Sequence, residues 1–507
     1  KDNPSGTGGG ALPGGIGWYR KTFDIKDRSL FKHYYIHFDG VYMNSEVFIN
    51  GHSLGTRPYG YISFEYDLTP YLNKNGSRNV IAVRVDNGHQ PNSRWYSGCG
   101  IYRHVHLIEV GDVHVAQWGT QITASDVMKD KARLDIRVTV KNEKNSTVGT
   151  VVKNEIIDPL GKRVGSCSSR VTIKSGTQEV NAQSCYIEGP KLWDIDKPNL
   201  YKVHTYLMEG NKIVDEYVTS IGLRDFYFDV TKGFFLNGKN MKINGVCQHH
   251  DLGCLGAALN DAALHRQLKI LKEMGCNAIR CSHNPPAPEL LNMCDSMGFV
   301  VLDEAFDMWH RKKTAYDYAN YFDKWYKKDL TDMVARDRNH PCIILWSIGN
   351  EVLEQWNDAN ADSLSLEQAN MILNFGHKIM DGAKDGKKNV CSLLTMQLAD
   401  IVRGLDNRPI TSACNEPSPN NNLFLANTLD VIGFNYHNQN IPSVPQNFPG
   451  KPFIITESVS ALQTRGYYHM PSDSIMICPE RWDKPYTNPS FSCSAYDNCH
   501  VPWGSTH

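Results

Sequence analysis

The chain has 507 residues and a mass of 57.2 kDa, a length that corresponds to about three domains. With 41% hydrophobic and 21% charged residues it can bury sizeable cores, so a disordered chain is excluded. Lys and Arg number 53 against 54 Asp and Glu, and the resulting net charge of −1 provides no field to attract nucleic acid or an anionic membrane surface. No run of 18 apolar residues occurs, which excludes a membrane-spanning helix.

Residues 1 to about 112 are predicted to form an antiparallel β-sandwich. Segments such as YYIHFDGV, ISFEYDLT and NVIAVRVDN alternate apolar with polar residues, and Asn50-Gly51 and Asn75-Gly76 supply turns between strands. Short strands at this spacing are typical of sandwiches. The Gly-rich opening PSGTGGGALPGG is expected to be a flexible leader.

Residues 113–225 continue in the same β style. ARLDIRVTVKN, STVGTVVKNEIID and YKVHTYLMEGNKIVDEYVTSIG belong to a stretch of roughly seven short strands, the pattern of an immunoglobulin-like sandwich. We find no catalytic candidate in this stretch. It is therefore expected to space and brace the two other domains.

From Phe226 onward the chain alternates strands with helices. Leu264, Leu268 and Leu271 have helical spacing, and further helices are predicted near residues 321–337, 365–381 and 391–404. Between the helices lie apolar strand segments such as CNAIRC, FVVLDE, CIILWSIGNE and PFIITE. A strand-then-helix repeat with short loops predicts a parallel sheet.

Most of these strands end in polar residues, among them His249–His250–Asp251, Asn350–Glu351, Asn435–Tyr436–His437 and Glu457. Polar residues at the carboxyl ends of many successive strands are what the active face of a (β/α)8 barrel requires. A doubly wound sheet would gather them at one switch point instead. We therefore predict a barrel over residues 226–507.

Seven barrel strands can be counted, and the eighth is missing. Residues 458–507 are rich in Ser, Pro and Tyr and are predicted to be irregular. A barrel that lacks one strand would leave two unpaired edges, so we expect the natural protein to continue beyond His507. The chain begins at Lys1 without Met or a readable targeting signal, and we treat both ends as truncations.

Two glutamates suggest chemistry. Glu351 ends IILWSIGNE and Glu457 ends PFIITE, and each follows a buried apolar strand that would normally avoid a charge. Counted along the chain they lie on the fourth and seventh strands, which face each other across a barrel mouth. Paired carboxylates about 5–5.5 Å apart are used in retaining glycoside hydrolysis, and about 6.5–9.5 Å apart in inverting hydrolysis. The alternative is that they form structural ion pairs with Arg280 or other cations.

The motifs WSIGNE, IITES, NAIRCSHNP, GFVVLDEAFDMW and SRWYSGCGIYRHV resemble motifs of glycoside hydrolase family 2, and the domains follow that family's order of sandwich, immunoglobulin-like domain and barrel. The chain resembles this family nearly end to end, and its Gly-rich opening is most similar to bacterial β-galactosidases. The resemblance implies a sugar-binding jelly-roll sandwich over 1–112, the immunoglobulin-like sandwich over 113–225 and the barrel over 226–507.

The resemblance also implies roles for residues. Glu351 becomes the general acid/base, protonated in the free enzyme, and Glu457 the ionised nucleophile, positioned by Arg280. Further sugar contacts are implied for Asn350, His283, Asp307, Trp309, Tyr436, Arg94 and Trp95. Among these, Asn350 would bond the 2-hydroxyl, Tyr436 would bond the nucleophile, Asp307 would accept a sugar hydroxyl and Trp309 would provide an aromatic platform.

Structural interpretations stay open for several of these residues. Asn350 is otherwise a turn residue, Tyr436 and His283 are satisfied core residues, and Trp95 is a sandwich core residue. Asp303 and Glu304 are equally interpretable as structural partners of Arg280.

A metal site is not expected. The 14 cysteines form no C-x-x-C motif. Adjacent His249 and His250 would point to opposite faces of a strand, so they would not chelate zinc together. Some β-galactosidases of the family use Mg²⁺ near the acid/base, but its ligands are not recognisable in this sequence.

The function that follows is a retaining exo-β-glycosidase acting on terminal β-galactosides. The alternatives are a β-glucuronidase or β-mannosidase of the same family, or a non-catalytic carbohydrate-binding protein. A carbohydrate is the expected partner, and self-association is common among such multidomain enzymes. We favour a periplasmic or extracellular location over a cytoplasmic one.

Overall fold

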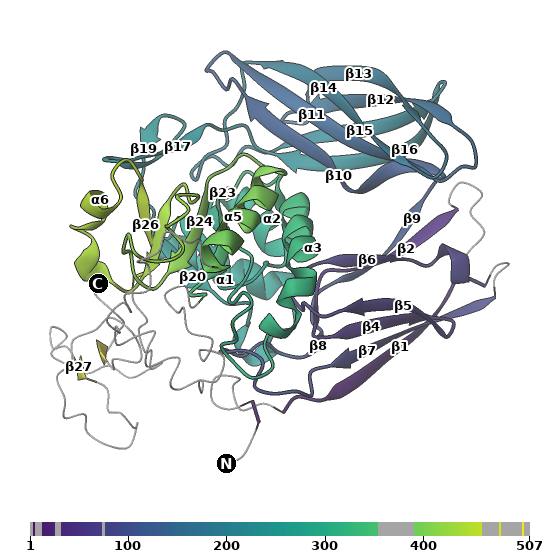
Figure 1. Cartoon of the computed structure of the whole chain (residues 1–507). Helices are drawn as coiled ribbons and strands as arrows, with labels where there is room; N and C mark the ends of the chain where they lie inside the picture. The colour runs from purple at the N-terminus through teal and green to yellow at the C-terminus, as the bar shows by residue number, and fades with distance from the viewer. Residues whose placement is uncertain are drawn as a thin grey trace.

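The computed structural model describes residues 4–5, 13–25, 32–73, 77–352, 390–458, 476–477 and 499–500. Within them, two β-sandwiches and a parallel barrel lie together (Figure 1). The helix predicted near residues 365–381 lies outside the described residues, as does nearly all of the segment predicted to be irregular. No helix in the described ranges is long and apolar enough to cross a membrane.

The first sandwich consists of antiparallel sheets ordered β1-β7-β4-β5 and β6-β2-β9, with a short β3-β8 pair. Its strands are β1 (Ile16–Asp24), β2 (His33–Phe38), β3 (Val41–Tyr42), β4 (Ser45–Ile49), β5 (His52–Arg57), β6 (Phe64–Asp67), β7 (Arg78–Asp86), β8 (Gly100–Ile101) and β9 (Val105–Val110). Val47 and Val83 face inward because alternate residues of each strand point to the same side, and both are buried. The predicted alternation therefore forms one core between the sheets.

The second sandwich consists of sheets ordered β10-β11-β14 and β13-β12-β15-β16, seven strands in all among the described residues. The strands are β10 (Val113–Ser125), β11 (Lys131–Asn142), β12 (Val148–Ile157), β13 (Arg163–Ile173), β14 (Gln178–Glu188), β15 (Tyr201–Glu209) and β16 (Lys212–Ile221). A disulfide joins Cys167 of β13 to Cys185 of β14 and thereby links the two sheets. The immunoglobulin-like architecture predicted from the sequence is confirmed.

A small antiparallel sheet leads into the barrel, formed by β17 (Phe226–Asp229), β18 (Gly233–Leu236) and β19 (Lys239–Asn240). The barrel strands are β20 (Gly245–Gln248), β21 (Ala278–Cys281), β22 (Val300–Glu304), β23 (Ile343–Asn350), β24 (Ile410–Cys414), β25 (Ile432–Asn435) and β26 (Phe453–Glu457). The helices between them are α1 (Asp261–Glu273), α2 (Pro288–Met297), α3 (Ala319–Asp337), α5 (Val390–Arg403) and α6 (Val444–Asn447). Short pieces complete the described part: η1 (Thr69–Tyr71), η2 (Gly253–Leu255), η4 (Asn438–Asn440), β27 (Met476–Ile477) and β28 (Cys499–His500).

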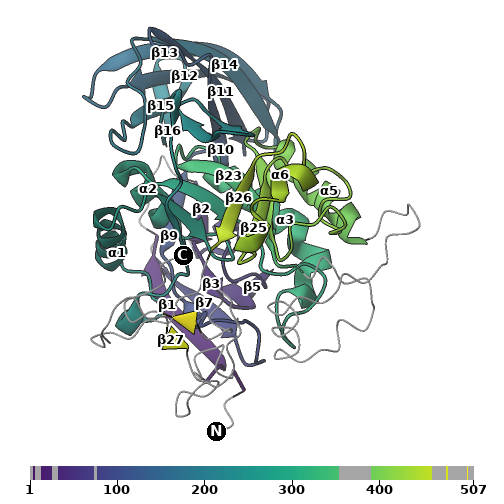
Figure 2. The ribbon, with the colours of Figure 1, turned by 90° about the vertical axis from the view of Figure 1, so that its left-hand side faces the viewer.

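The seven barrel strands pair in parallel, each with the next along the chain. Each coincides with a strand predicted from the sequence. The first and last strands of this described sheet, β20 and β26, approach each other. The Cys247 thiol on β20 lies 3.1 Å from the Thr456 carbonyl oxygen on β26. The sheet is therefore a nearly closed barrel, as Figure 2 shows from the side.

The central strand β23 is buried along its whole length. Gly349 lies on it where space is short, because a Cβ atom at this position would lie 2.9 Å from Nε1 of Trp309. The Trp309 indole instead donates to the carbonyl of Ile348 at 2.9 Å. The glycine of WSIGNE thus lets a large side chain support the strand that carries the acid/base candidate.

Buried polar contacts fix the first sandwich to the barrel. Arg57 pairs with Asp329 at 2.5 Å and with Asp332 at 2.8 Å, both on α3. Tyr59 donates to the carbonyl of Ala305 just after β22, and Arg103 donates to the Pro285 and Pro286 carbonyls. Loop 92–97 of the sandwich lies against the carboxyl ends of the barrel strands, because Arg94 bonds with Asp307 and His250 contacts the Ser97 carbonyl.

Candidate active site

The two glutamates converge at the carboxyl ends of the fourth and seventh strands. Glu351 directly follows β23 and Glu457 ends β26. The side-chain amide of Asn435 donates to Oε1 of Glu351 at 2.9 Å and to Oε1 of Glu457 at 3.0 Å. Because both bonds share one nitrogen, the two oxygens lie no further apart than the sum of these lengths, 5.9 Å.

Two site residues adopt backbone conformations that side chains rarely take. Glu351 has φ 43° and Tyr436 has φ 58°, both in the left-handed region. A non-glycine residue held in a sparsely populated region costs about 1–3 kcal/mol, which the surrounding fold has to offset. Here the Glu351 amide donates to the Ala413 carbonyl at 2.7 Å and the Tyr436 amide to the Glu457 carbonyl at 2.6 Å. The strands thus hold both residues at the barrel mouth.

Glu457 is surrounded by donors. Arg280 donates to its Oε1 at 2.8 Å, and the Tyr436 hydroxyl makes a short hydrogen bond to its Oε2. Burial and the neighbouring Glu457 charge raise the pKa of Tyr436 far above its ordinary value, so this phenol keeps its proton and donates it. These contacts fix the orientation of the Glu457 carboxylate.

Glu304 holds Arg280 and His283 in place. It accepts two bonds from Arg280 Nη2 at 2.8 Å and one contact with Nδ1 of His283 at 2.8 Å. Burial raises the pKa of Glu304 to about 7, against the charge of Arg280, which lowers it. Burial and the Arg280 charge hold the pKa of His283 well below its usual range, so its ring is neutral. Nε2 of His283 lies 3.5 Å from Glu457.

Asn350 is completely buried and its orientation is determined on both sides. Its carbonyl oxygen accepts from Arg280 at 2.8 Å and from Asn435 at 3.2 Å, and its amide donates to Asp307 at 2.9 Å.

Asp307 is occupied by protein donors. Arg94 contacts its two oxygens at 2.7 and 3.3 Å, and Lys313 contacts Oδ1 at 2.7 Å. Burial alone would raise the pKa of Asp307, but the charges of Arg94 and Lys313 hold it well below its usual range. These bonds let Asp307 orient Asn350 and Arg94, and its role as an acceptor for a sugar hydroxyl stays a prediction. Lys313 also donates to the backbone carbonyl of Asn350 at 2.8 Å.

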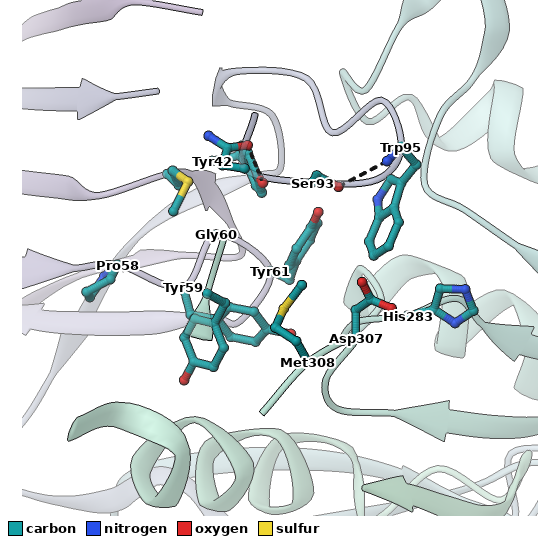
Figure 3. Close-up of a pocket in the computed structure, with 13 residues that line it drawn as sticks. Tyr42, Pro58, Tyr59, Gly60, Tyr61, Ser93, Trp95, His283, Asp307 and Met308 are labelled. Atoms are coloured by element: carbon teal, nitrogen blue, oxygen red, sulfur yellow. Dashed lines mark hydrogen bonds between the residues drawn. The ribbon is translucent and has the colours of Figure 1, made fainter. Parts of the chain in front are cut away.

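The first sandwich contributes Arg94 and Trp95. Figure 3 shows Trp95, His283 and Asp307 around one small pocket between sandwich and barrel. Arg94 reaches Oε2 of Glu351 at 3.4 Å, and the Trp95 ring lies 5.5 Å from the His283 ring. Nε1 of Trp95 is buried and makes no hydrogen bond among the described residues. Trp95 therefore lies where the sandwich meets the barrel, and its contact with a sugar stays a prediction.

Trp309 and Asp303 differ from their predictions. The Trp309 side chain is 1% exposed and packs beneath the site, so its ring faces no open space as a platform would. Asp303 lies near Asp337, and burial together with that negative charge raises its pKa well above the ordinary value. Only Glu304 of this pair bonds with Arg280.

His249 and His250 separate, as predicted. The His249 ring packs 5.0 Å from Trp95, and the His250 ring packs 5.4 Å from Tyr61 while its Nε2 contacts the Ser97 carbonyl. Within the described residues, the one cluster that could hold a metal consists of Asp295, His340 and Cys342, near the amino end of β23.

Asn435 and Lys313 were not assigned roles from the sequence. Asn435 belongs to a polar group at a strand end, which is a usable signal. Lys313 lies in the loop between β22 and α3, where no local pattern indicates burial.

A barrel with two glutamates this close at the ends of its fourth and seventh strands has the architecture and site of a glycoside hydrolase. Comparison with family models agrees over most of the chain. The sugar binding domain of glycosyl hydrolases family 2 matches residues 12–111, a second model described as glycosyl hydrolases family 2 matches residues 113–224, and its TIM barrel domain matches residues 228–375. The chain belongs to glycoside hydrolase family 2.

Individual relatives extend this similarity. The chain is 60% identical to the Bacteroides ovatus protein named beta-galactosidase BoGH2A, over 100% of the chain and 60% of that protein. It is 30% identical to a Bacteroides fragilis beta-glucuronidase, over 67% of the chain and 50% of that protein. A crystal structure of a family member from Bacteroides cellulosilyticus superposes with a TM-score of 0.80 at 38% identity, covering 90% of the chain and 55% of that structure. The chain thus spans about 60% of the length of the curated relative named first.

Proposed function

We propose that the protein is a retaining exo-β-glycosidase that hydrolyses terminal non-reducing β-galactosides. One observation carries the proposal: a single amide, that of Asn435, bonds both Glu351 and Glu457 and limits their oxygens to 5.9 Å. This limit on the two Oε1 atoms fits the spacing of about 5–5.5 Å used for retention better than the range of about 6.5–9.5 Å used for inversion.

In the first step, Glu457 attacks the anomeric carbon while Glu351 gives its proton to the glycosidic oxygen. The leaving group departs with that proton, and a covalent glycosyl-enzyme remains. Arg280 and Tyr436 both donate to Glu457 and thereby orient its carboxylate for attack. When the bond forms, the negative charge on Glu457 is lost.

In the second step, Glu351 takes a proton from water, which attacks the anomeric carbon and releases Glu457. We expect the side-chain amide of Asn350 to bond the sugar 2-hydroxyl, a contact that strengthens as the oxocarbenium ion develops. Asn350 is already bonded to Arg280 and Asp307, so its geometry is set before the sugar arrives.

A neutral galactoside is the preferred substrate class. The relative at 60% identity is named a beta-galactosidase. The cations Arg94, Arg280 and Lys313 each contact a carboxylate of the protein, so their charges are already compensated. A uronate would compete with Asp307 and Glu457 for these cations. β-Glucuronidase activity is the second candidate, since the relative at 30% identity carries that name.

A panel of nitrophenyl β-glycosides, assayed with the 507-residue protein, tests the reaction. We expect turnover of the galactoside and loss of turnover in Glu457→Ala. Glu351→Ala is expected to regain turnover with azide and to form the β-glycosyl azide, because small anions can replace water where the general base is absent. Glu273→Gln, an exposed change on α1, serves as the control. Unchanged turnover in Glu457→Ala would contradict the mechanism.

A non-catalytic sugar-binding protein would have its two carboxylates far apart or engaged in ion pairs. The separation argues against this alternative. The ion pairs of Arg280 with Glu457 and of Arg94 with Glu351 are compatible with both, because donors beside the two carboxylates can also orient them for reaction. The azide experiment separates the two, since a binding protein forms no glycosyl azide.

We also propose an oxidising compartment, periplasmic or extracellular. The disulfide Cys167–Cys185 supports this, because such bonds are rare where thiols are kept reduced. Fractionation of the native organism tests the location. Self-association stays a prediction, which light scattering of the purified protein can check.

A further inference from the structure

A second cleft, of about 510 Å³, lies at the opposite end of the barrel from the glutamates. Its walls come from β10 and β16 of the immunoglobulin-like sandwich, from β17, and from the loops that precede β23, β24, β25 and β26. Figure 1 shows β10 and β16 on the side of that sandwich next to the barrel. Ile343 begins β23 and Glu351 follows its end, so the two sites are about 26 Å apart at about 3.3 Å per residue.

Arg224 lines this cleft and carries an uncompensated charge. Its Nε makes a short hydrogen bond to the Pro341 carbonyl, and its Nη2 donates to the Ile343 carbonyl at 2.6 Å. Among the described residues, no carboxylate lies within ion-pair distance of it. The Phe226 ring lies 4.6 Å from its guanidinium. Arg224 is partly exposed at this cleft, and because its bonds go only to carbonyl oxygens its positive charge is available to a ligand in the cleft.

A second arginine increases the imbalance. Arg408 donates to the same Ile343 carbonyl at 3.2 Å, which places the two guanidinium groups side by side. Asp406 is committed to Arg408 at 2.8 Å and to the Trp346 indole at 3.1 Å. Burial and the nearby Arg408 lower the pKa of Arg224 to about 9. Asp406 is therefore a nearby carboxylate for both Arg224 and Arg408, but it forms its ion pair with Arg408.

Arg338 adds a third cation to the wall. Its Nη2 donates to the Trp118 and Thr120 carbonyls at 3.0 and 3.4 Å, and its buried Nε has no partner in the described part of the chain. The other charged groups around the cleft are Asp430, held by Arg403 at 3.2 Å, His340, paired with Asp295 at 2.6 Å, and Asp225, which is exposed. Arg224 and Arg338 are thus the cations that lack a carboxylate.

We propose that this cleft binds the oxyanion group of a small molecule, with Arg224 and Arg338 as its ligands. A carboxylate or a phosphate in the cleft would accept hydrogen bonds from the guanidinium groups that line it and supply negative charge. The cleft is far larger than one ion requires, since a water occupies about 30 Å³. The shared chemistry is the oxyanion, and its source is either inorganic phosphate or an acidic monosaccharide. The proposal is independent of the catalytic one, because it uses the other end of the barrel.

Calorimetric titration of the 507-residue protein tests the site, with inorganic phosphate, D-glucuronate and D-glucose as probes at constant ionic strength. We expect at least one of the two anions to bind. Arg224→Met is expected to weaken that binding by about tenfold or more, about 1.4 kcal/mol. Arg338→Met should weaken it as well, and it also covers the case in which Arg224→Met does not fold. The control is Arg163→Met, on an exposed part of the same sandwich.

Binding of glucuronate alone would assign the site to an acidic sugar, and binding of phosphate alone would assign it to an inorganic anion. D-Glucose has the same ring without the charge and is expected not to respond to either cleft variant. The proposal is overturned if neither anion binds. It is also overturned if binding is the same in Arg224→Met and Arg338→Met as in the unmodified protein, which would place the anion elsewhere.

Discussion

Replacement of Asn435 by alanine removes the one amide that connects the two glutamates. Asn435 is completely buried and donates to Glu457 at 3.0 Å and to Glu351 at 2.9 Å. A hydrogen bond to a charged group contributes about 1.5–3 kcal/mol. Since about 1.36 kcal/mol corresponds to a tenfold change in rate, loss of the Glu457 contact alone predicts a decrease of about 10- to 100-fold in kcat/KM. Loss of the second contact extends the decrease toward about a thousandfold.

The assay is kcat/KM for a nitrophenyl β-galactoside, measured together with thermal unfolding. Asn447→Ala, an exposed change on α6, is the matched control and is expected to leave kcat/KM unchanged. Asn435→Asp should be at least as damaging as Asn435→Ala, because it places a third carboxylate beside two others. If Asn435→Ala folds and keeps kcat/KM within about threefold of the original value, the amide does not set the geometry of the pair and the reasoning is wrong.

Lys313→Met should lower the free energy of unfolding by about 3–5 kcal/mol, because it breaks a buried ion pair with Asp307. It should also lower kcat/KM more than tenfold, because Lys313 supports the backbone of Asn350. Denaturant unfolding and kinetics measure the two effects, and unchanged values in both would contradict the role of Lys313. Burial alone would lower the pKa of His37, but Asp39 and Glu65 raise it to about 9. Its stabilising contribution is therefore complete below about pH 6.5 and is lost as the pH rises through about 9, up to about 3 kcal/mol at about 1.36 kcal/mol per pH unit. The free energy of unfolding, measured as a function of pH across this range, should vary less in His37→Gln than in the unmodified protein. An equal slope of this free energy against pH in both proteins would exclude His37 as the cause. The double change Cys167→Ser and Cys185→Ser removes a disulfide that closes a loop with a sequence separation of 18, and it should lower the free energy of unfolding by about 3 kcal/mol. We expect kcat/KM at room temperature to stay unchanged. Calorimetry and kinetics test both expectations, and an unchanged unfolding temperature would contradict the first.

The barrel strands were predictable because each is marked by residues that are neighbours in the sequence. Each strand is a short apolar run, and the polar residues that follow it mark the carboxyl end, so β23 and β26 with Glu351 and Glu457 could be placed without knowing the fold. The bond between Tyr436 and Glu457 was predictable for a related reason, since consecutive parallel strands bring their ends together.

Other features depend on distant parts of the chain. The orientation of Trp309 is set by the space that Gly349 leaves, 40 residues further along the sequence. Asp307 has the residue type of a hydroxyl acceptor, but Arg94 from another domain and Lys313 from a long loop use its oxygens. The pairing of Cys167 with Cys185 required the two sheets to be packed, because spacing alone does not determine which cysteines meet.

The origin of Arg94 has a consequence for how this enzyme architecture can change. Arg94 belongs to loop 92–97 of the amino-terminal sandwich, yet it contacts Glu351 and Asp307 of the barrel. Mutations in the amino-terminal sandwich can therefore change the surroundings of Glu351 and Asp307 without altering any residue of the barrel. Exchange of this loop between homologues would show whether it sets sugar preference in the proposed reaction, and an excised barrel would lack the Arg94 contacts however well it folded.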